Sequence, residues 1–185
     1  MKTGPILKEA LTRDERRAAG KALRDKVSRA SHAEWKPPAD RQNPIDSLIE
    51  SSRGRLKELL PIRYGRMIQS PFAFYRGAAA IMAADLAYTP TTEIVVQTCG
   101  DCHLMNFGGF ATPERRIIFD INDFDETLPA PWEWDIKRLA TSFAVAGHHN
   151  GFNKEEARER SITLCAKLSW THANLCQYGR SWNMA

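Results

Sequence analysis

The stretch QTCGDCHLMNFGGFATPERRIIFDINDFDET, from Gln97 to Thr127, decides how the rest of the chain is interpreted. It holds six Asp or Glu residues, one His and two Cys between apolar runs. Three kinds of segment fit such a composition: a metal site, a phosphoryl-transfer site or a solvated acidic loop whose Asp and Asn side chains cap turns. The spacing of the polar residues separates these possibilities.

An Asp at position 101 precedes an Asn at position 106, which is the spacing of the protein-kinase catalytic loop H-R-D-x-x-x-x-N. In that loop the Asp accepts the proton of the substrate hydroxyl and the Asn holds a metal ion. We therefore predict that Asp101 is a catalytic base and that Asn106 is a metal ligand. His103 joins the candidate catalytic set as a residue that orients the loop.

A second group of carboxylates follows in IIFDINDFDE. Asp123 ends an expected strand and precedes Phe124, as the metal-binding Asp of a D-F-G motif does, and Asp120 is the rival metal ligand. Magnesium prefers hard oxygen ligands and needs few protein carboxylates when phosphates supply the others. Arg76 is the candidate for binding nucleotide phosphates, with ion pairing to the acidic loop as the alternative.

The pattern around this stretch predicts an α+β protein that is mostly helical. Residues 1–43 form a basic N-terminal arm and linker, and residues 44–185 form the region that carries the motifs. We expect strands over 93–99, 105–111 and 115–121, the last two joined as a hairpin. Helical patterns cover residues 7–30, 44–60, 70–90, 131–152 and 153–178, with Asn43, Ser70 and Asp135 as expected caps.

Composition narrows the class further. The chain has 185 residues, 43% of them apolar and 26% charged, which is typical of a soluble globular protein. No secretory leader or membrane span is visible, so we expect a cytoplasmic protein with free thiols. Sixteen Lys or Arg against nine Asp or Glu make residues 1–70 basic, but the acids interleave with the bases, and we predict no nucleic-acid binding.

Together, GDCHLMN, INDFDE and WEWDIKRLA resemble the motifs G-D-x-H-x-x-N, I-D-[WF] and D-L-A of aminoglycoside phosphotransferases and choline kinases. The resemblance implies a partial protein-kinase-like fold that uses Mg²⁺ and ATP to phosphorylate a small molecule. It assigns Asp101 as the base, Asn106 and Asp123 as metal ligands, and Asp135 as a structural residue that braces the catalytic loop.

A closer resemblance extends from PIRYGRMIQSPFAFYRG to VAGHHNGF, and by it the chain is identified as a member of the bacterial DUF2252 family. The chain departs from that pattern at Glu93, Cys102, Ala130 and His148-His149, where Gly, Ala, Gly and an Arg-containing pair are expected. The resemblance implies that the family continues beyond GRSWNMA into a Gly-rich segment and a strand Lys, so we expect this chain to be incomplete at its C-terminus. Neither a G-x-G-x-x-G nor a G-x-x-x-x-G-K-[ST] motif occurs here. We therefore expect only the catalytic-loop half of a site, weak or no Mg²⁺–ATP binding, and an exposed apolar face where the other half would dock.

Three other functions stay open. Asp123 and Asp125 in DFDET match the D-x-D-x-T signature of haloacid-dehalogenase-type phosphatases, whose fold requires a doubly wound parallel sheet. Cys99-x-x-Cys102 resembles half of a zinc site or a redox pair. A non-catalytic module that binds a metal or ligand would keep the same polar residues without turnover.

Overall fold

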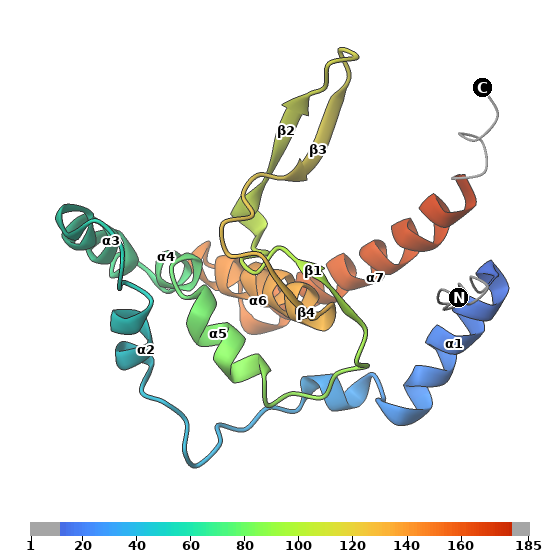
Figure 1. Cartoon of the computed structure of the whole chain (residues 1–185), viewed down its shortest axis with the longest axis horizontal. Coiled ribbons are helices and arrows are strands. Elements are labelled where there is room, and N and C mark those ends of the chain that lie inside the picture. Colours follow the sequence, from blue (N-terminus) through green and yellow to red (C-terminus); the bar gives the residue numbers. More distant parts are fainter. Residues whose placement is uncertain (1–11, 179–185) are drawn as a thin grey trace, which may run out of the picture.

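The computed structural model describes residues 12–178, and it is an α+β structure in which helices predominate (Figure 1). The first helix, α1 (Arg13–Lys26), begins at Thr12, whose side chain accepts a hydrogen bond from the Glu15 amide while Glu15 bonds back to Thr12. This reciprocal pair satisfies two amides that the first turn would otherwise leave unpaired. No residue of α1 is buried, as the sequence predicted for a basic arm.

A short 3-10 turn, η1 (Ala30–Ala33), and the linker that contains Arg41 follow α1. The Arg41 guanidinium donates to both carboxylate oxygens of Asp85 at 2.6 and 2.7 Å, and it lies over the Trp35 ring. The linker is therefore attached to α5 (Ala79–Leu86) by a bidentate ion pair.

Two predicted helices are each broken into shorter pieces, which corrects the sequence-based prediction. The helix expected over 44–60 ends as α2 (Pro44–Glu50), and the chain then turns through Gly54, whose φ of +81° a helix cannot accommodate. It resumes as η2 (Lys57–Leu59) and α3 (Leu60–Met67). The predicted Asn43 cap of α2 is confirmed, because its side chain accepts from the Ile45 amide.

The helix expected over 70–90 divides into α4 (Pro71–Arg76) and α5 at Gly77. Ser70 caps α4 as predicted, accepting from the Ala73 amide. A Cβ at Gly77 would lie 2.6 Å from the Met67 sulfur, so a larger residue at this break would require the Met67 side chain to shift. Short helices therefore replace two long ones, with a left-handed glycine at the first break and a glycine packed against Met67 at the second.

The strands form two antiparallel pairs. β2 (Phe107–Ala111) pairs with β3 (Ile117–Ile121), which confirms the predicted hairpin. β1 (Val95–Thr98) pairs with β4 (Leu128–Pro131), a strand that the sequence analysis missed because two of its four residues are proline. The described residues contain no parallel pair, so the doubly wound sheet that a haloacid-dehalogenase-type phosphatase requires is not found in them.

The two C-terminal helices confirm the prediction, although the first starts later than expected. α6 (Glu133–His149) and α7 (Lys154–Tyr178) pack closely where Gly147 meets Ala157, and Gly151 with a φ of +81° turns the chain between them. The motif loop is the segment of residues 99–106. Its Cys99 and Cys102 form a buried cluster with Leu139 of α6, around which pack Leu104, Phe107, Ile121, Phe143 and Leu164. The loop is thus packed directly on α6.

The hairpin projects away from the helices (Figure 1). Its strand β3 leaves Ile117 and Phe119 exposed at 86% and 75% of their surface. Within residues 12–178, no helix is both long enough and apolar enough to cross a lipid bilayer.

Candidate catalytic loop

Asp135 fixes the start of the motif loop. Its carboxylate accepts hydrogen bonds from the main-chain amides of Cys99 at 2.7 Å and Gly100 at 3.2 Å, just after β1 ends. Burial raises the pKa of Asp135, and these two amides partly oppose that effect. The bracing role implied by the resemblance is confirmed, whereas the expected helix cap is wrong: α6 begins at Glu133 and has no side-chain cap.

Gly100 permits this contact because its φ is +80°. A Cβ at this position would lie 1.9 Å from the main-chain oxygen of Glu126. The acidic segment that follows the hairpin therefore passes directly over the start of the loop. This close approach brings the two halves of the motif, which are far apart in the sequence, into contact.

Asn106 connects those halves. It is 6% exposed, and its Nδ2 donates to the main-chain oxygen of Asp101 at 3.1 Å and to that of Asp123 at 3.0 Å. The same nitrogen lies 3.4 Å from the Cys99 sulfur. The structure thus brings the Asn106 side chain against the main chain of Asp101 and Asp123, while the shared metal site predicted from their carboxylate and amide oxygens stays a prediction.

Asp101 forms an ion pair that the sequence analysis did not anticipate. Its Oδ1 accepts from Nε of Arg138 at 2.8 Å and also from Nη2 of the same guanidinium. Arg138 is 2% exposed and lies over the Tyr75 ring, 4.5 Å from its centroid. A second missed residue is Ser142, whose hydroxyl accepts from the Leu104 amide at 3.0 Å.

One signal could have revealed these residues. Asp135, Arg138, Leu139 and Ser142 are spaced as i, i+3, i+4 and i+7, which places them on one face of a helix. Once Asp135 is assigned to the loop, its neighbours on that face are expected to contact the loop too. The expectation would have followed from helical geometry alone.

His103 is buried within the loop. Its Nδ1 accepts from the Met105 amide at 3.1 Å, which orients the ring, and its Nε2 lies 3.5 Å from Oδ2 of Asp101. Burial lowers the pKa of His103, Asp101 raises it, and the positive charges of Arg138 and Arg76 lower it further. The neutral ring favoured by these effects fits the predicted loop-orienting role.

The candidate metal ligands lie at the exposed edge of the loop. Oδ1 of Asp123 accepts from the Asp125 amide at 2.9 Å, and Oδ1 of Asp120 accepts from the Ile121 amide at 2.8 Å. Both residues are exposed, and the main-chain oxygen of Asp123 accepts a hydrogen bond from the Asn106 side chain. Residues 12–178 contain no cluster of three or more His, Cys, Asp or Glu residues able to hold a metal ion by themselves.

Arginine side chains surround the loop. Arg76 at the end of α4 is exposed and close enough to His103 to influence its pKa. Arg55 donates to Glu126 at 3.2 Å, and Arg63 donates to the main-chain oxygen of Gly77 at 2.7 Å. Arg55, which the sequence did not single out, thus pairs with the acidic segment, and the assignment of Arg76 to phosphate stays a prediction.

The two cysteines of the loop are free thiols in the core. Burial raises the pKa of Cys99 and raises that of Cys102 to about 12, so both stay protonated at neutral pH. Redox exchange requires a thiolate, so the redox alternative is not favoured at neutral pH. Residues 12–178 contain no group of three or more His, Cys, Asp or Glu that could hold a metal ion, so neither thiol has the partners of a zinc site among them.

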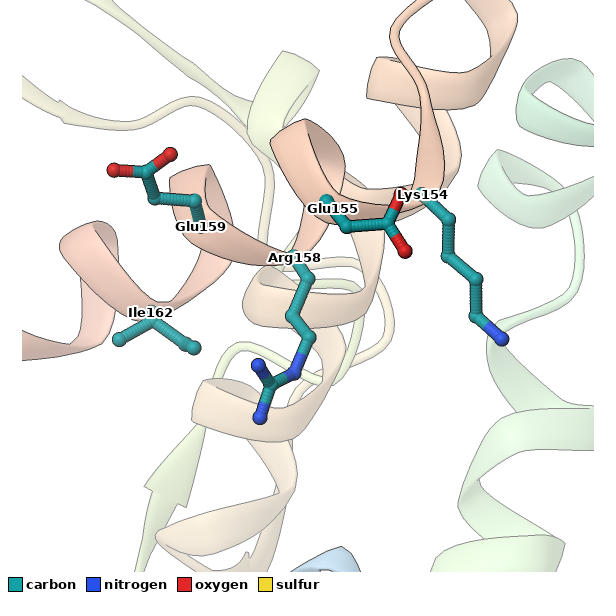
Figure 2. Close-up of a pocket in the computed structure, with 5 residues that line it drawn as sticks. All are labelled: Lys154, Glu155, Arg158, Glu159 and Ile162. Carbon is teal, nitrogen blue, oxygen red and sulfur yellow. The ribbon is translucent and has the colours of Figure 1, made fainter.

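Two cavities differ in their relation to the loop. A groove of about 300 Å³ is lined by Lys154, Glu155, Arg158, Glu159 and Ile162, all from the start of α7 (Figure 2). A second cavity touches Gly100, Asp135 and Arg138 but has a volume of only about 10 Å³. The groove contains none of the motif residues, and the second cavity is too small for a nucleotide.

Comparison with known proteins gives one positive result. No curated protein and no solved structure matches the chain. A family model described as "Uncharacterized protein conserved in bacteria (DUF2252)" matches residues 55–172, which include the whole motif loop, both strand pairs and α6. The chain therefore belongs to the DUF2252 family.

Proposed function

We propose that this chain supplies the catalytic-loop side of an Mg²⁺-dependent phosphoryl transfer from ATP to a small molecule. The observation that carries the proposal is the position of Asn106. Its side chain links the segment of Asp101 to the segment of Asp123, so a candidate base and a candidate metal ligand belong to one hydrogen-bonded unit. Phosphoryl transfer requires such a unit, because its catalysis consists mainly of positioning and electrostatic stabilisation.

The donor set fits magnesium only in part. Asn106 and Asp123 would hold the ion, offering an amide oxygen and a carboxylate, both of which are hard ligands. The described residues offer no cage of three carboxylates, which excludes a cation site built by these side chains alone. Such a pair suits an ion that also keeps waters and substrate phosphates as ligands. Bound there, magnesium would offset charge on the transferring group.

The protein's own residues have distinct parts in this proposal. Asp101 accepts the proton of the acceptor hydroxyl, for which its Oδ2 is available because Arg138 engages Oδ1. His103 orients the loop through Met105, and Asp135 holds the loop's first amides. Arg76 is the residue we assign to a phosphate group.

The residues that the structure describes do not enclose ATP. The cavity beside the loop holds about 10 Å³, whereas ligand pockets typically measure roughly 300–1,000 Å³. The proposal therefore assigns no adenine or ribose contact to this chain. The same observation favours a second candidate function, a module that binds a metal or an anionic ligand at the loop without turnover.

Paramagnetic broadening tests the proposal even when binding is weak. Amide spectra of the ¹⁵N-labelled chain would be titrated with Mn²⁺–ATP, and we expect broadening confined to residues 101–106 and 122–126. Asp123→Asn should remove it, and Asp120→Asn should not. Broadening along α7 instead, or none at all, would end the proposal.

Turnover separates the two candidate functions. ADP release in the presence of Mg²⁺ and an acceptor panel of sugars, amines and alcohols indicates a phosphotransferase. Localised broadening without ADP release indicates the binding module.

A further inference from the structure

A buried arginine beside the candidate base is the feature that the proposed function leaves unexplained. Arg138 extends from α6 toward the loop and is 2% exposed. A guanidinium removed from water destabilises the fold unless its donors are satisfied and its charge is paired. Arg138 meets this requirement through the Asp101 carboxylate and the main-chain oxygen of Tyr75, which its Nη2 approaches to 2.9 Å.

The geometry at the carboxylate is asymmetric. Both Nε and Nη2 of Arg138 donate to the same oxygen, Oδ1 of Asp101. The second oxygen, Oδ2, faces His103, whose Nε2 lies 3.5 Å away. Because two nitrogens of one guanidinium hold the same carboxylate oxygen, the carboxylate cannot rotate freely. Its second oxygen therefore points in a fixed direction.

The arginine is itself held in place. Its guanidinium lies 4.5 Å from the centroid of the Tyr75 ring, and Nη1 is 3.5 Å from the Met82 sulfur. A lysine could approach Oδ1, but its single ammonium lacks the planar fork that reaches both Asp101 and the Tyr75 main chain. The arrangement therefore uses a property that only arginine has.

We propose that Arg138 is the positioning residue of Asp101: it holds Oδ1 so that Oδ2 is the oxygen presented to the acceptor hydroxyl. The inference rests on the proposed function for its catalytic meaning, while the hold on Asp101 can be tested without it. Arg138 touches neither the acceptor hydroxyl nor the transferred phosphate. It acts entirely through the orientation of the Asp101 carboxylate.

Tyr75 offers a matched structural control. Its hydroxyl donates to the main-chain oxygen of Arg138 at 2.7 Å, which links α4 to α6 without touching Asp101. Tyr75→Phe removes this bond and keeps both the aromatic ring and the main-chain oxygen that Arg138 uses. Loss of packing alone should therefore appear equally in Tyr75→Phe and Arg138→Lys, whereas loss of positioning should appear only in Arg138→Lys.

The first arm of the experiment uses the unaltered chain and needs no variant to fold. The Nε–H signal of Arg138 is recorded by ¹⁵N NMR and compared with that of Arg66, an exposed residue of α3. We expect Arg138 Hε to exchange with water at least about a hundredfold more slowly, since burial and the Asp101 bond protect it. Equal exchange rates would show that the guanidinium is not held, and the proposal would be overturned.

The second arm compares Arg138→Lys with Tyr75→Phe by thermal unfolding, by the ¹⁵N signals of the His103 ring at one pH, and by ADP release from Mg²⁺–ATP. We expect both variants to lower Tm. Only Arg138→Lys should shift the His103 signals and lower kcat by about tenfold or more, with KM within about twofold. Matching His103 signals and kcat in the two variants would overturn the positioning role.

The two arms keep the failures apart. If Mn²⁺–ATP broadens no signals at the loop of the unaltered chain, the proposed function fails, but Hε exchange and the His103 signals still decide whether Arg138 fixes Asp101. If ADP is released and both NMR signatures are absent, the phosphotransferase proposal stands and the role of Arg138 is overturned.

Discussion

The side-chain nitrogen of Asn106 lies 3.0 Å from the main-chain oxygen of Asp123, although 17 positions separate the two residues in the chain. The hairpin of β2 and β3 accounts for this meeting, because its two strands leave from Asn106 and return to the residue before Asp123 in register. The contact makes the geometry of the candidate site depend on the hairpin.

Asn106→Ala should destabilise the fold as well as the site. It removes two hydrogen bonds, to the main-chain oxygens of Asp101 and Asp123, which keep the His103 amide and the Cys99 thiol as donors, and a typical hydrogen bond contributes about 0.5–1.5 kcal/mol. Urea unfolding measures the loss. Asp120→Ala is the control, since Asp120 is exposed, and its effect should stay within about 0.5 kcal/mol. Equal stability of the two variants would contradict the linking role of Asn106.

Asp101→Asn, made at the equivalent position of a full-length relative, should abolish most turnover of that protein. If Asp101 is the base, the loss is at least about a hundredfold, the low end for acid–base groups. The structure adds a stability effect, because Arg138 then faces a neutral amide, and a hydrogen bond to a charged group contributes about 1.5–3 kcal/mol. Activity is therefore measured below the Tm of the variant. Turnover within a fewfold of the unaltered relative would remove Asp101 from the mechanism.

Gly100→Ala should be more damaging than the same change at Gly54 or Gly151. All three glycines have φ near +80°, so the strain of a left-handed alanine, about 1–2 kcal/mol, is common to them. Only at Gly100 would the new Cβ meet backbone, at 1.9 Å from the Glu126 oxygen, whereas nothing lies within 4 Å of the other two. We expect Gly100→Ala to lose about 1–3 kcal/mol more in urea unfolding. Similar losses of unfolding free energy at all three positions would show that the acidic segment moves away from the new Cβ at little cost.

Glu93→Gly should stabilise the chain. Glu93 is exposed and has a φ of 61°, a left-handed conformation that glycine adopts without strain. Relief of about 1–2 kcal/mol of left-handed strain is partly offset by the 0.5–1 kcal/mol entropy cost of glycine, which leaves a gain of about 0.5–1 kcal/mol. Differential scanning calorimetry should show a higher Tm. A lower Tm would mean that the Glu93 side chain contributes more than its backbone strain costs.

Acid should destabilise the fold through His103. Its folded pKa lies below the ordinary 6.5, so the unfolded chain binds more protons and stability falls as pH drops from 6.5 toward that folded pKa. His103→Asn, whose amide oxygen can replace Nδ1 as the acceptor for Met105, should flatten this part of the Tm profile between pH 5 and 8. His149→Asn, at the exposed end of α6, should retain the slope. An unchanged slope in His103→Asn would assign the acid sensitivity to another group.

Part of the fold could be predicted because its signals are local. The hairpin follows from two apolar runs around a turn, and the caps at Asn43 and Ser70 follow from side chains that bond amides two or three residues away. The spacing of Asp101, Asn106 and Asp123 was enough to bring them into one hypothesis. Periodicity did not reveal the breaks at Gly54 and Gly77, because a glycine can continue a helical pattern, and neither the positive φ at Gly54 nor the Met67 contact at Gly77 is visible in the spacing of apolar residues.

The sequence by itself determined an α+β class, the hairpin, and which polar residues belong to the loop, since each rests on neighbours within a few positions. Only the tertiary structure decided that β4 pairs with β1, that Asp135 faces the loop instead of capping its helix, and that Arg138 holds Asp101 from 37 positions away. The physical reason is that burial of a side chain in the folded protein determines which partner it contacts. A charged side chain removed from water must find its partner, and the partner is chosen by how α6 packs against the loop and not by any residue beside it in the chain.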